Sequence, residues 1–483
     1  MEQREADVCV VGAGFAGLAA ARVLKIAGKS FVVLEARDRV GGRVWAKEFE
    51  DGTKVSVGGT WIGDGQDRLK ALVDEVGLGK YPQYEGDVDP EDPDDPLDPL
   101  DHGAETILRL DGANHRYKGL FAPIGVENLA VVGLAFEQLK ALSATLPLDR
   151  PWEAPNATAL DAQTLGGWIA SPLNVPSDKA QIMLRQTMRL FFSAEPEEVS
   201  LLGSLVLARG GSGQGFEYYA AQKYTETHLV DGDGGGMPEV ADRLARTLGD
   251  AIRTSSPVRR IRHSPGGVEV IGDDVTVRAK FAIVTAPPIL AGVIDYEPPL
   301  PAAYGQLMRK TPPGAIFRFV VKYETAFWRA EGLSGETVAP QSLVPVSIDQ
   351  CPKALTEGGD PPYGLLSCYA VGPAADTLAR MSPAERKTTV LNELATRLSD
   401  KAVTECIGFS ETDWSAEPWS CGGMIAHFSP GVLTSYGHVL HEPAGPIYWA
   451  GSERATDMHG LIEGAIRSGE QAANDVLAKL GSA

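Results

Sequence analysis

The sequence predicts an α/β fold that contains a nucleotide-binding domain of the Rossmann type. The first observation is an apolar run from Asp7 to Val11 that ends in a glycine-rich turn, which is typical of a buried parallel strand. The second is an alanine-rich helical stretch that continues to Lys29. The third is another apolar run, which ends at the acid Glu35. A strand, a glycine turn, a helix and a second strand ending in a carboxylate form the start of a dinucleotide-binding unit.

The glycine turn reads Gly12-Ala-Gly14-Phe-Ala-Gly17, and each glycine has its own role in such a unit. Gly12 permits the tight turn, Gly14 lets the backbone approach a pyrophosphate, and Gly17 lets the helix pack closely on the strand. The helix N-terminus offers N–H groups and a partial positive charge to the phosphates. Glu35 lies where a carboxylate accepts hydrogen bonds from ribose hydroxyls.

A second glycine turn, rich in arginine, follows Glu35 directly. Guanidinium groups suit a diphosphate because they are planar, permanently charged and able to bind in a bidentate fashion. We therefore expect Arg37, Gly42 and Arg43 to supply a second phosphate contact. The alternative is an arginine-rich surface loop with a Gly-Gly turn.

With these motifs the chain resembles the FAD-dependent amine oxidase family, which includes monoamine oxidases and polyamine oxidases. The resemblance continues through Val57-Gly-Gly59-Thr60-Trp61-Ile-Gly63, a motif that lies along the flavin in this family. It implies that Gly59, Thr60 and Trp61 contact bound FAD. Gln66 follows in the same matching stretch.

Two later segments support the resemblance. A helix-like run to Leu248 is followed by Val258, which resembles the family's return to the FAD domain and would contact the adenine end through its backbone. Near the C-terminus, a helix expected to begin near Leu461 would aim its dipole at the flavin and stabilise negative charge on the reduced ring. The resemblance implies further flavin contacts from Gly451, Ser452, Leu461 and Ile462. Trp419 can pack on the flavin edge, and the alternative is an ordinary core residue.

The same resemblance implies a Rossmann-type FAD-binding domain with an interleaved α+β substrate-binding domain. The predicted FAD-binding domain is discontinuous and consists of residues 1–85, 230–300 and 415–483. The predicted substrate-binding domain consists of residues 86–229 and 301–414.

Composition agrees with a large cytoplasmic enzyme. The 483 residues correspond to roughly three average domains. The first strand begins too close to Met1 for a leader peptide, and no apolar run approaches the ~20 residues of a membrane helix. Five cysteines without metal-ligand spacing favour free thiols in a reducing compartment and no metal site. The net charge of −20 argues against nucleic-acid binding.

Much of the negative charge lies in the proline-rich segment Glu85–Asp101. Such a composition cannot build a packed core, so we expect a solvated surface loop. The functional alternative is a lid or an electrostatic funnel for cationic amines.

Three positions at the expected flavin face depart from the family pattern. The lysine that in the family holds a water near flavin N5 is Arg318, which keeps the charge but not a compact ammonium. The cysteine that attaches the flavin in monoamine oxidases is Met424, so we expect non-covalent FAD. The two aromatic residues that enclose the amine are Ile425 and Leu461, which removes any cation–π contribution. The alternative for Arg318 is an exposed strand residue.

Three polar residues lie near these positions in the sequence: His427, Asp457 and His459. Their grouping favours at least one contact with the pocket, and His459 is our candidate for it, beside Arg318, Ile425 and Leu461. Each of the three can equally be a loop residue.

The sequence thus predicts an FAD-dependent oxidoreductase that oxidises a C–N bond of a bulky or apolar amine. A hydride passes from the α-carbon to flavin N5, water hydrolyses the resulting imine, and O₂ or another electron acceptor reoxidises the flavin. The alternatives are a desaturase or isomerase that acts on C–C bonds, and a flavin-binding protein without catalysis. We expect no membrane or nucleic-acid partner, and the oligomeric state stays open, with a homodimer as one alternative.

Overall fold

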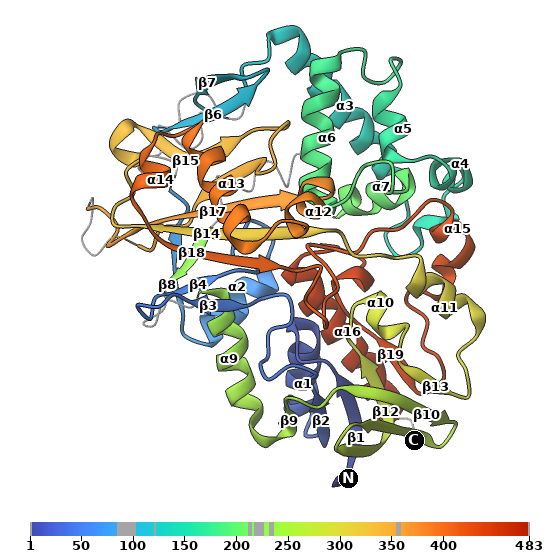
Figure 1. Cartoon of the computed structure of the whole chain (residues 1–483). Helices are drawn as coiled ribbons and strands as arrows, with labels where there is room; N and C mark the ends of the chain where they lie inside the picture. Colours follow the sequence, from blue (N-terminus) through green and yellow to red (C-terminus); the bar gives the residue numbers. More distant parts are fainter. Residues whose placement is uncertain are drawn as a thin grey trace.

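The computed structural model describes residues 2–84, 103–119, 122–210, 215–216, 227–230, 236–353 and 359–481. Two large sheets lie at different levels of the molecule, and helices cover them (Figure 1). The acidic segment 85–101 lies outside the described residues, so the expectation of a surface loop stays a prediction.

The first sheet, which we call the nucleotide sheet, has the order β13-β10-β11-β12-β1-β2-β9, with β19 paired to β12. Strand β1 is central and runs parallel to both β2 and β12. Its bounds are β1 (Glu2–Val11), β2 (Phe31–Leu34), β9 (Ile252–Arg253), β10 (Val258–Ser264), β11 (Gly267–Gly272), β12 (Val275–Val284), β13 (Asp295–Glu297) and β19 (Ile447–Trp449). The predicted buried parallel strand is therefore present, and the α/β class is confirmed.

Three helices pack on one face of this sheet: α1 (Phe15–Ile26), α9 (Met237–Leu248) and α16 (Ile462–Gly481). The sequence placed the end of the first helix at Lys29, and this was wrong by three residues. The helix ends at Ile26 because Gly28 takes a left-handed backbone conformation (φ +67°) that turns the chain toward β2.

The second sheet has the order β18-β14-β17-β16-β15-β6-β7 and is antiparallel except where β15 meets β6. Its bounds are β6 (Glu105–Leu110), β7 (Ala113–Tyr117), β14 (Ile316–Tyr323), β15 (Leu333–Val338), β16 (Val346–Asp349), β17 (Gly364–Val371) and β18 (Cys406–Asp413). Side chains alternate along β14, so Phe317, Phe319 and Val321 pack on one face. They share a core there with the helices α12 (Pro373–Ala379), α13 (Pro383–Ala395) and α14 (Lys401–Thr404). Arg318 therefore points to the opposite face.

The remaining elements surround these sheets. Helices α3 to α7 form a layer beside the second sheet (Figure 1). The other helices and the small sheets β3–β4 and β5–β8 have the bounds α2 (Asp67–Glu75), α3 (Val126–Ala144), α4 (Ala157–Ala162), α5 (Leu165–Ala170), α6 (Asp178–Phe192), α7 (Leu201–Arg209), α10 (Pro288–Ala291), α11 (Ala302–Arg309), α12 (Pro373–Ala379), α13 (Pro383–Ala395), α14 (Lys401–Thr404), α15 (Val432–Tyr436), β3 (Ala46–Glu48), β4 (Lys54–Ser56), β5 (Gly79–Pro82) and β8 (Thr227–Val230). Short 3-10 turns are η1 (Pro151–Glu153), η4 (Gly249–Ala251), η5 (Arg329–Glu331), η6 (Gly437–Val439) and η7 (Ser452–Arg454).

The strands of the nucleotide sheet come from three separate parts of the chain, before, between and after the strands of the second sheet. The two domains are therefore interleaved in sequence, while their exact boundaries stay a prediction. Within the described ranges, no helix combines the length and the apolar character needed to cross a bilayer.

Candidate functional site

A cavity of about 510 Å³ lies where the two sheets meet. Residues at the carboxyl ends of β1, β2 and β12 line one part of it, and residues of β14 and β17 line another. Open α/β sheets bind ligands at the carboxyl ends of their strands, and the volume is within the ~300–1,000 Å³ that is usual for small-molecule sites.

The cavity brings together residues that the sequence places far apart. The predicted site residues that line it are Gly12, Gly14, Glu35, Arg37, Gly42, Arg43, Gly59, Thr60, Trp61, Val258, Arg318, Trp419, Ile425, Gly451, Ser452, His459, Leu461 and Ile462. Gly17 does not line it, but a Cβ there would lie 1.9 Å from the carbonyl oxygen of Gly12, which fits its predicted role in close helix–strand packing. His427 and Asp457 are not among the lining residues.

We call one part of the cavity the glycine end; it is formed by Gly12, Gly14, Glu35, Arg37 and Gly42. Gly12 has a φ of +103°, which a side chain would strain. A Cβ on Gly42 would lie 3.2 Å from Cα of Gly14, so the two glycine turns are in contact. At these two glycine turns the backbone, and not side chains, faces the cavity.

The charges of the glycine end are mostly satisfied within the protein. Glu35 is 3% exposed, and its carboxylate accepts hydrogen bonds from the backbone N–H of Ala13 (2.7 Å) and of Arg37 (2.9 Å). The Arg37 guanidinium pairs with Glu417 and donates to Ser420 Oγ (2.7 Å). Its buried Nε has no hydrogen-bond partner among the described residues. A spare buried donor in the cavity wall fits an anionic ligand group such as a diphosphate.

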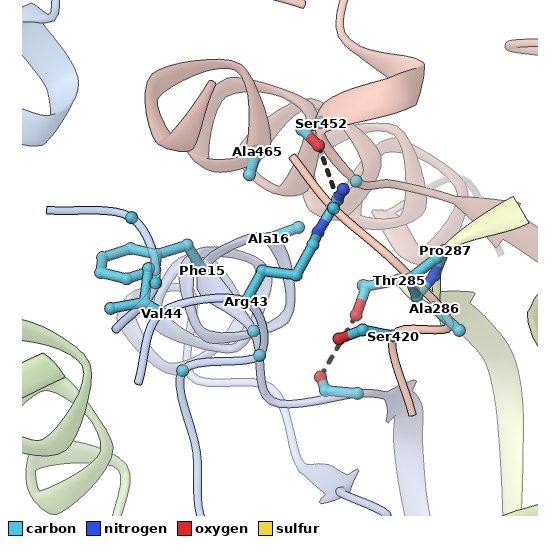
Figure 2. Close-up of a pocket in the computed structure, with 18 of the residues that line it drawn as sticks. Phe15, Ala16, Arg43, Val44, Thr285, Ala286, Pro287, Ser420, Ser452 and Ala465 are labelled. Atoms are coloured by element: carbon cyan, nitrogen blue, oxygen red, sulfur yellow. Dashed lines mark hydrogen bonds between the residues drawn. The ribbon is translucent and has the colours of Figure 1, made fainter. Parts of the chain in front are cut away.

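Arg43 connects the second glycine turn to the C-terminal segment. Its Nη1 and Nη2 bind the Glu453 carboxylate at 2.6 and 2.9 Å, and Nη2 also donates to Ser452 Oγ (2.8 Å). Figure 2 shows the Arg43 side chain extended toward Ser452. Burial alone would raise the pKa of Glu453, but the charge and hydrogen bonds of Arg43 hold it at about 2. Arg43 thus fixes two segments together, and its predicted contact with phosphate stays a prediction.

We call the opposite part the Arg318 end; it is formed by Thr60, Trp61, Arg318, Tyr369, Ile425 and Leu461. Arg318 is 2% exposed, so the alternative of an exposed strand residue is wrong. Its guanidinium donates to Ser367 Oγ (3.0 Å), to Thr60 Oγ1 (3.0 Å), to Gln350 Oε1 (2.9 Å) and to the carbonyl of Gly58. These bonds join β14 to β17 and to the segment around Thr60.

Arg318 forms no salt bridge with a carboxylate of the described residues; its guanidinium lies beside two neighbouring aromatic rings, whose centroids are 6.3 Å apart. Its Cζ is 5.4 Å from the ring centroid of Trp61 and 5.2 Å from that of Tyr369. Burial lowers the pKa of Arg318. The Arg318 end therefore contains a fixed cation that the protein solvates with neutral oxygens and ring faces.

Aliphatic side chains complete this end. Ile425 is buried, and a Cβ on Gly460 would lie 2.2 Å from its Cγ2, so Ile425 packs directly on the turn before Leu461. His459 lines the cavity beside them and is 4% exposed. Burial lowers the pKa of His459 against the opposing charge of Glu453, so its ring is neutral near pH 7.

Several lining residues were missed by the sequence reasoning, among them Phe191, Leu207, Tyr369 and Trp414. Tyr369 pairs across the sheet with Arg318, and Trp414 Nε1 donates to the carbonyl of Val57 (2.9 Å). No local motif surrounds these residues, and the pairing of Tyr369 with Arg318 is known only from the structure.

A sequence profile of the flavin containing amine oxidoreductases matches residues 15–477. Putrescine oxidase of Kocuria rosea is 34% identical over 492 residues, which cover 98% of this chain and 95% of that protein. Among solved structures, wild-type putrescine oxidase bound to putrescine has a TM-score of 0.87 at 30% identity and covers 99% of this chain and 100% of its own. Cyclohexylamine oxidase from Brevibacterium oxydans IH-35A has a TM-score of 0.86 at 27% identity and 99% coverage of both chains.

Proposed function

The chain belongs to the flavin-containing amine oxidoreductase family and is an FAD-dependent enzyme that oxidises amines, and we propose that its substrates are bulky or apolar amines. The observation that carries this proposal is that two aliphatic side chains, Ile425 and Leu461, line the Arg318 end. The family resemblance implies an aromatic residue at each of these two positions. The likeness to cyclohexylamine oxidase, named for an alicyclic amine, supports the same substrate class.

FAD would lie along the whole cavity. The turn at Gly12 and the N-terminus of α1 suit its diphosphate, with the spare Nε of Arg37 as an added donor. Glu35 is our proposed partner for the ribose hydroxyls, and its place in the cavity lining supports this. The residues proposed for the adenine end and for the isoalloxazine end are Val258, Trp419, Gly59, Thr60, Trp61, Gly451, Ser452, Leu461 and Ile462.

Bound FAD would supply the hydride acceptor for the α-carbon of the amine. The chain itself orients the amine and excludes water. Ile425 and Leu461 position the carbon skeleton, and the surrounding wall is buried. Arg318 supplies a fixed positive charge that stabilises negative charge at this end and does not exchange protons near pH 7. Neutral His459 offers a polar contact in the same wall.

The FAD is bound without a covalent link, because the thioether of Met424 at the expected attachment position cannot form one. Cys421 lies three residues earlier, and its Sγ contacts the carbonyl of Pro418 (3.5 Å). Acid precipitation of the yellow protein should leave the colour in the supernatant. Colour that stays in the pellet would contradict non-covalent binding.

We also propose O₂ as the electron acceptor and the cytoplasm as the location. The family's oxidases support the first. The second is supported by the five cysteines, all of which are free thiols.

Anaerobic mixing of the holoenzyme with a panel of amines tests the proposed function. Bleaching of the flavin by cyclic or branched monoamines supports it. Bleaching by olefinic or alicyclic compounds without nitrogen, and by no amine, would favour the desaturase alternative instead. An unchanged flavin with every compound would contradict catalysis of either kind.

A further inference from the structure

We infer that Gln83, which does not line the cavity, is a positioning residue that fixes the Trp61 ring at the Arg318 end. Through that ring, Gln83 determines which amines fit this end of the cavity. The inference rests on the proposed function, since it concerns the substrate of the same site. It adds a specificity-determining residue that lies behind the cavity wall.

The first support is the hydrogen bond between Trp61 and Gln83. An indole has a single N–H donor, and a buried donor needs an acceptor. Trp61 lines the cavity, yet its Nε1 donates to Gln83 Oε1 at 2.9 Å, behind the wall. The bond therefore directs the N–H edge of the indole into the wall and leaves the carbon part of the ring for the cavity.

The second support is that the Gln83 amide is itself held in one orientation. Its Nε2 donates to the backbone carbonyl of Asp349 (2.8 Å) at the end of β16, and the side chain is buried. With the amide turned over, Nε2 would face the Trp61 N–H, donor against donor, and Oε1 would face a carbonyl oxygen. Gln83 therefore cannot turn away from Trp61 without losing two buried hydrogen bonds.

The third support is that Asp349, the anchor of Gln83, is also fixed. Its carboxylate binds the Arg329 guanidinium through both oxygens, each at 2.9 Å, and accepts the indole N–H of Trp328 at 2.9 Å. Asp349 is buried, so these bonds are shielded from water. The position of the Gln83 amide is thus set by a rigid part of the second sheet.

The end of β16 holds a second member of the site as well. Gln350, the residue after Asp349, accepts a hydrogen bond from Arg318 Nη2 at 2.9 Å. The Arg318 guanidinium lies 5.4 Å from the centroid of the Trp61 ring. Two consecutive residues therefore set the distance between ring and cation. A Trp61 ring released from Gln83 would change the width of the cavity beside Arg318.

Two amines of equal charge and different width test the inference in the holoenzyme: cyclohexylamine and butylamine. Anaerobic stopped-flow reduction of the flavin gives an apparent Kd and a limiting rate for each. Gln83→Met has a similar length and removes the acceptor, so a wide amine must order a ring that is no longer held. We expect the apparent Kd for cyclohexylamine to rise roughly 3- to 10-fold, with the Kd for butylamine and both limiting rates within about twofold of wild type. Unchanged Kd values, or equal rises for both amines, would overturn the inference.

Trp61→Phe assigns the effect to the indole N–H, because phenylalanine keeps a ring and has no donor. It should by itself raise the ratio of the Kd for cyclohexylamine to that for butylamine. Adding Gln83→Met should then change this ratio by less than about twofold, since both changes remove the same bond. A wild-type ratio in Trp61→Phe, or a full second loss in the double variant, would contradict positioning through this bond.

Tyr81→Phe is the matched control. The Tyr81 hydroxyl donates to the carbonyl of Cys351 (3.1 Å), so this change breaks a neighbouring bond between the same two segments and leaves the bond between Trp61 and Gln83 in place. It should leave the Kd ratio unchanged, and thermal unfolding should show that every variant is folded. A shift in the ratio as large as that of Gln83→Met would mean that loosening of the segment causes the effect.

Failure of the inference and failure of the proposed function give different results. If neither amine reduces the flavin of the wild-type enzyme, the proposed function fails. If both amines reduce it and Gln83→Met binds them as the wild type does, the function stands and the inference about Gln83 is wrong.

Discussion

The glycine end and the Arg318 end of one cavity are built on opposite principles. At the glycine end, charges are matched within the protein: Glu35 with two backbone N–H groups, and Arg37 with Glu417. At the Arg318 end, a buried guanidinium is held by neutral oxygens and ring faces. Paired charges stabilise the geometry of a binding site. A charge without a counter-ion in the protein instead interacts electrostatically with the bound ligand.

The Arg43–Glu453 ion pair joins the second glycine turn to the C-terminal segment, and breaking it should give the largest effect on stability. Arg43→Met leaves the Glu453 carboxylate, 2% exposed, without its cation, which typically costs about 3–5 kcal/mol. Urea unfolding of the holoenzyme measures this. Arg68→Met is the control, because the Arg68 side chain is 51% exposed in its pair with Glu470, and its loss should cost at most about 1 kcal/mol. Equal losses in both variants would show that the pair is not a structural link.

Burial keeps the His427 side chain neutral, and the free energy of unfolding should therefore fall at acidic pH. Both ring nitrogens of His427 are buried without a hydrogen-bond partner in the described structure, and burial lowers its pKa from 6.5 to about 4. Between pH 6.5 and pH 4, His427 is protonated in the unfolded chain but stays neutral in the folded chain. The contribution of His427 to the free energy of unfolding is therefore fully present above pH 6.5. It is lost as the pH falls toward 4, by up to about 3 kcal/mol.

Unfolding curves at pH 7.5 and pH 4.5 measure that difference. His427→Leu should flatten the pH dependence in part, since His441 also has a pKa lowered to about 4 by burial and stays in place. The exposed His438 supplies the control, and His438→Leu should leave the dependence unchanged. An unaltered slope in His427→Leu would mean that other groups carry the acid sensitivity.

Glu35→Ala tests whether the glycine end binds the ribose of FAD. The ribose should lose a charge-assisted acceptor worth about 1.5–3 kcal/mol, so the Kd for FAD should rise by roughly 10- to 150-fold. Fluorescence titration of the apoprotein with FAD measures it, and Glu75→Ala, a change on the exposed face of α2, should not alter the affinity. Wild-type affinity in Glu35→Ala would mean that the adenosine lies elsewhere.

Aromatic residues at both Ile425 and Leu461 should give the smallest of these effects, and one that is confined to substrate choice. The turn at Gly460 leaves no room behind Ile425, so a ring must project into the cavity. Efficiency on bulky amines should fall by about tenfold, with any gain limited to small unbranched or benzylic amines. Ile425→Val is the control that should spare bulky amines. Unchanged steady-state kinetics on all substrates would show that neither position faces the amine.

The sequence alone determined the glycine end, and the reason is its locality. Gly12 and Gly14 lie within one strand–helix–strand unit and Glu35 follows its last strand directly, so their spacing fixes their geometry. The nucleotide sheet follows from the same unit, whereas its interleaving with a second domain and the FAD cofactor were implied by the resemblance to the amine oxidase family. Helix ends were less certain, because the single residue Gly28 decides where α1 stops.

Only the tertiary structure decided the character of the Arg318 end. Arg318, Tyr369 and Ile425 come from separate strands and loops, and no spacing in the sequence relates them. The resemblance marked Arg318 as a charged position, yet its burial, its neutral partners and its place beside the rings of Trp61 and Tyr369 depend on how β14 pairs with β17 and packs on the segment around Thr60. Electrostatics in a cavity depends on distances between residues remote in the chain, and folding sets those distances.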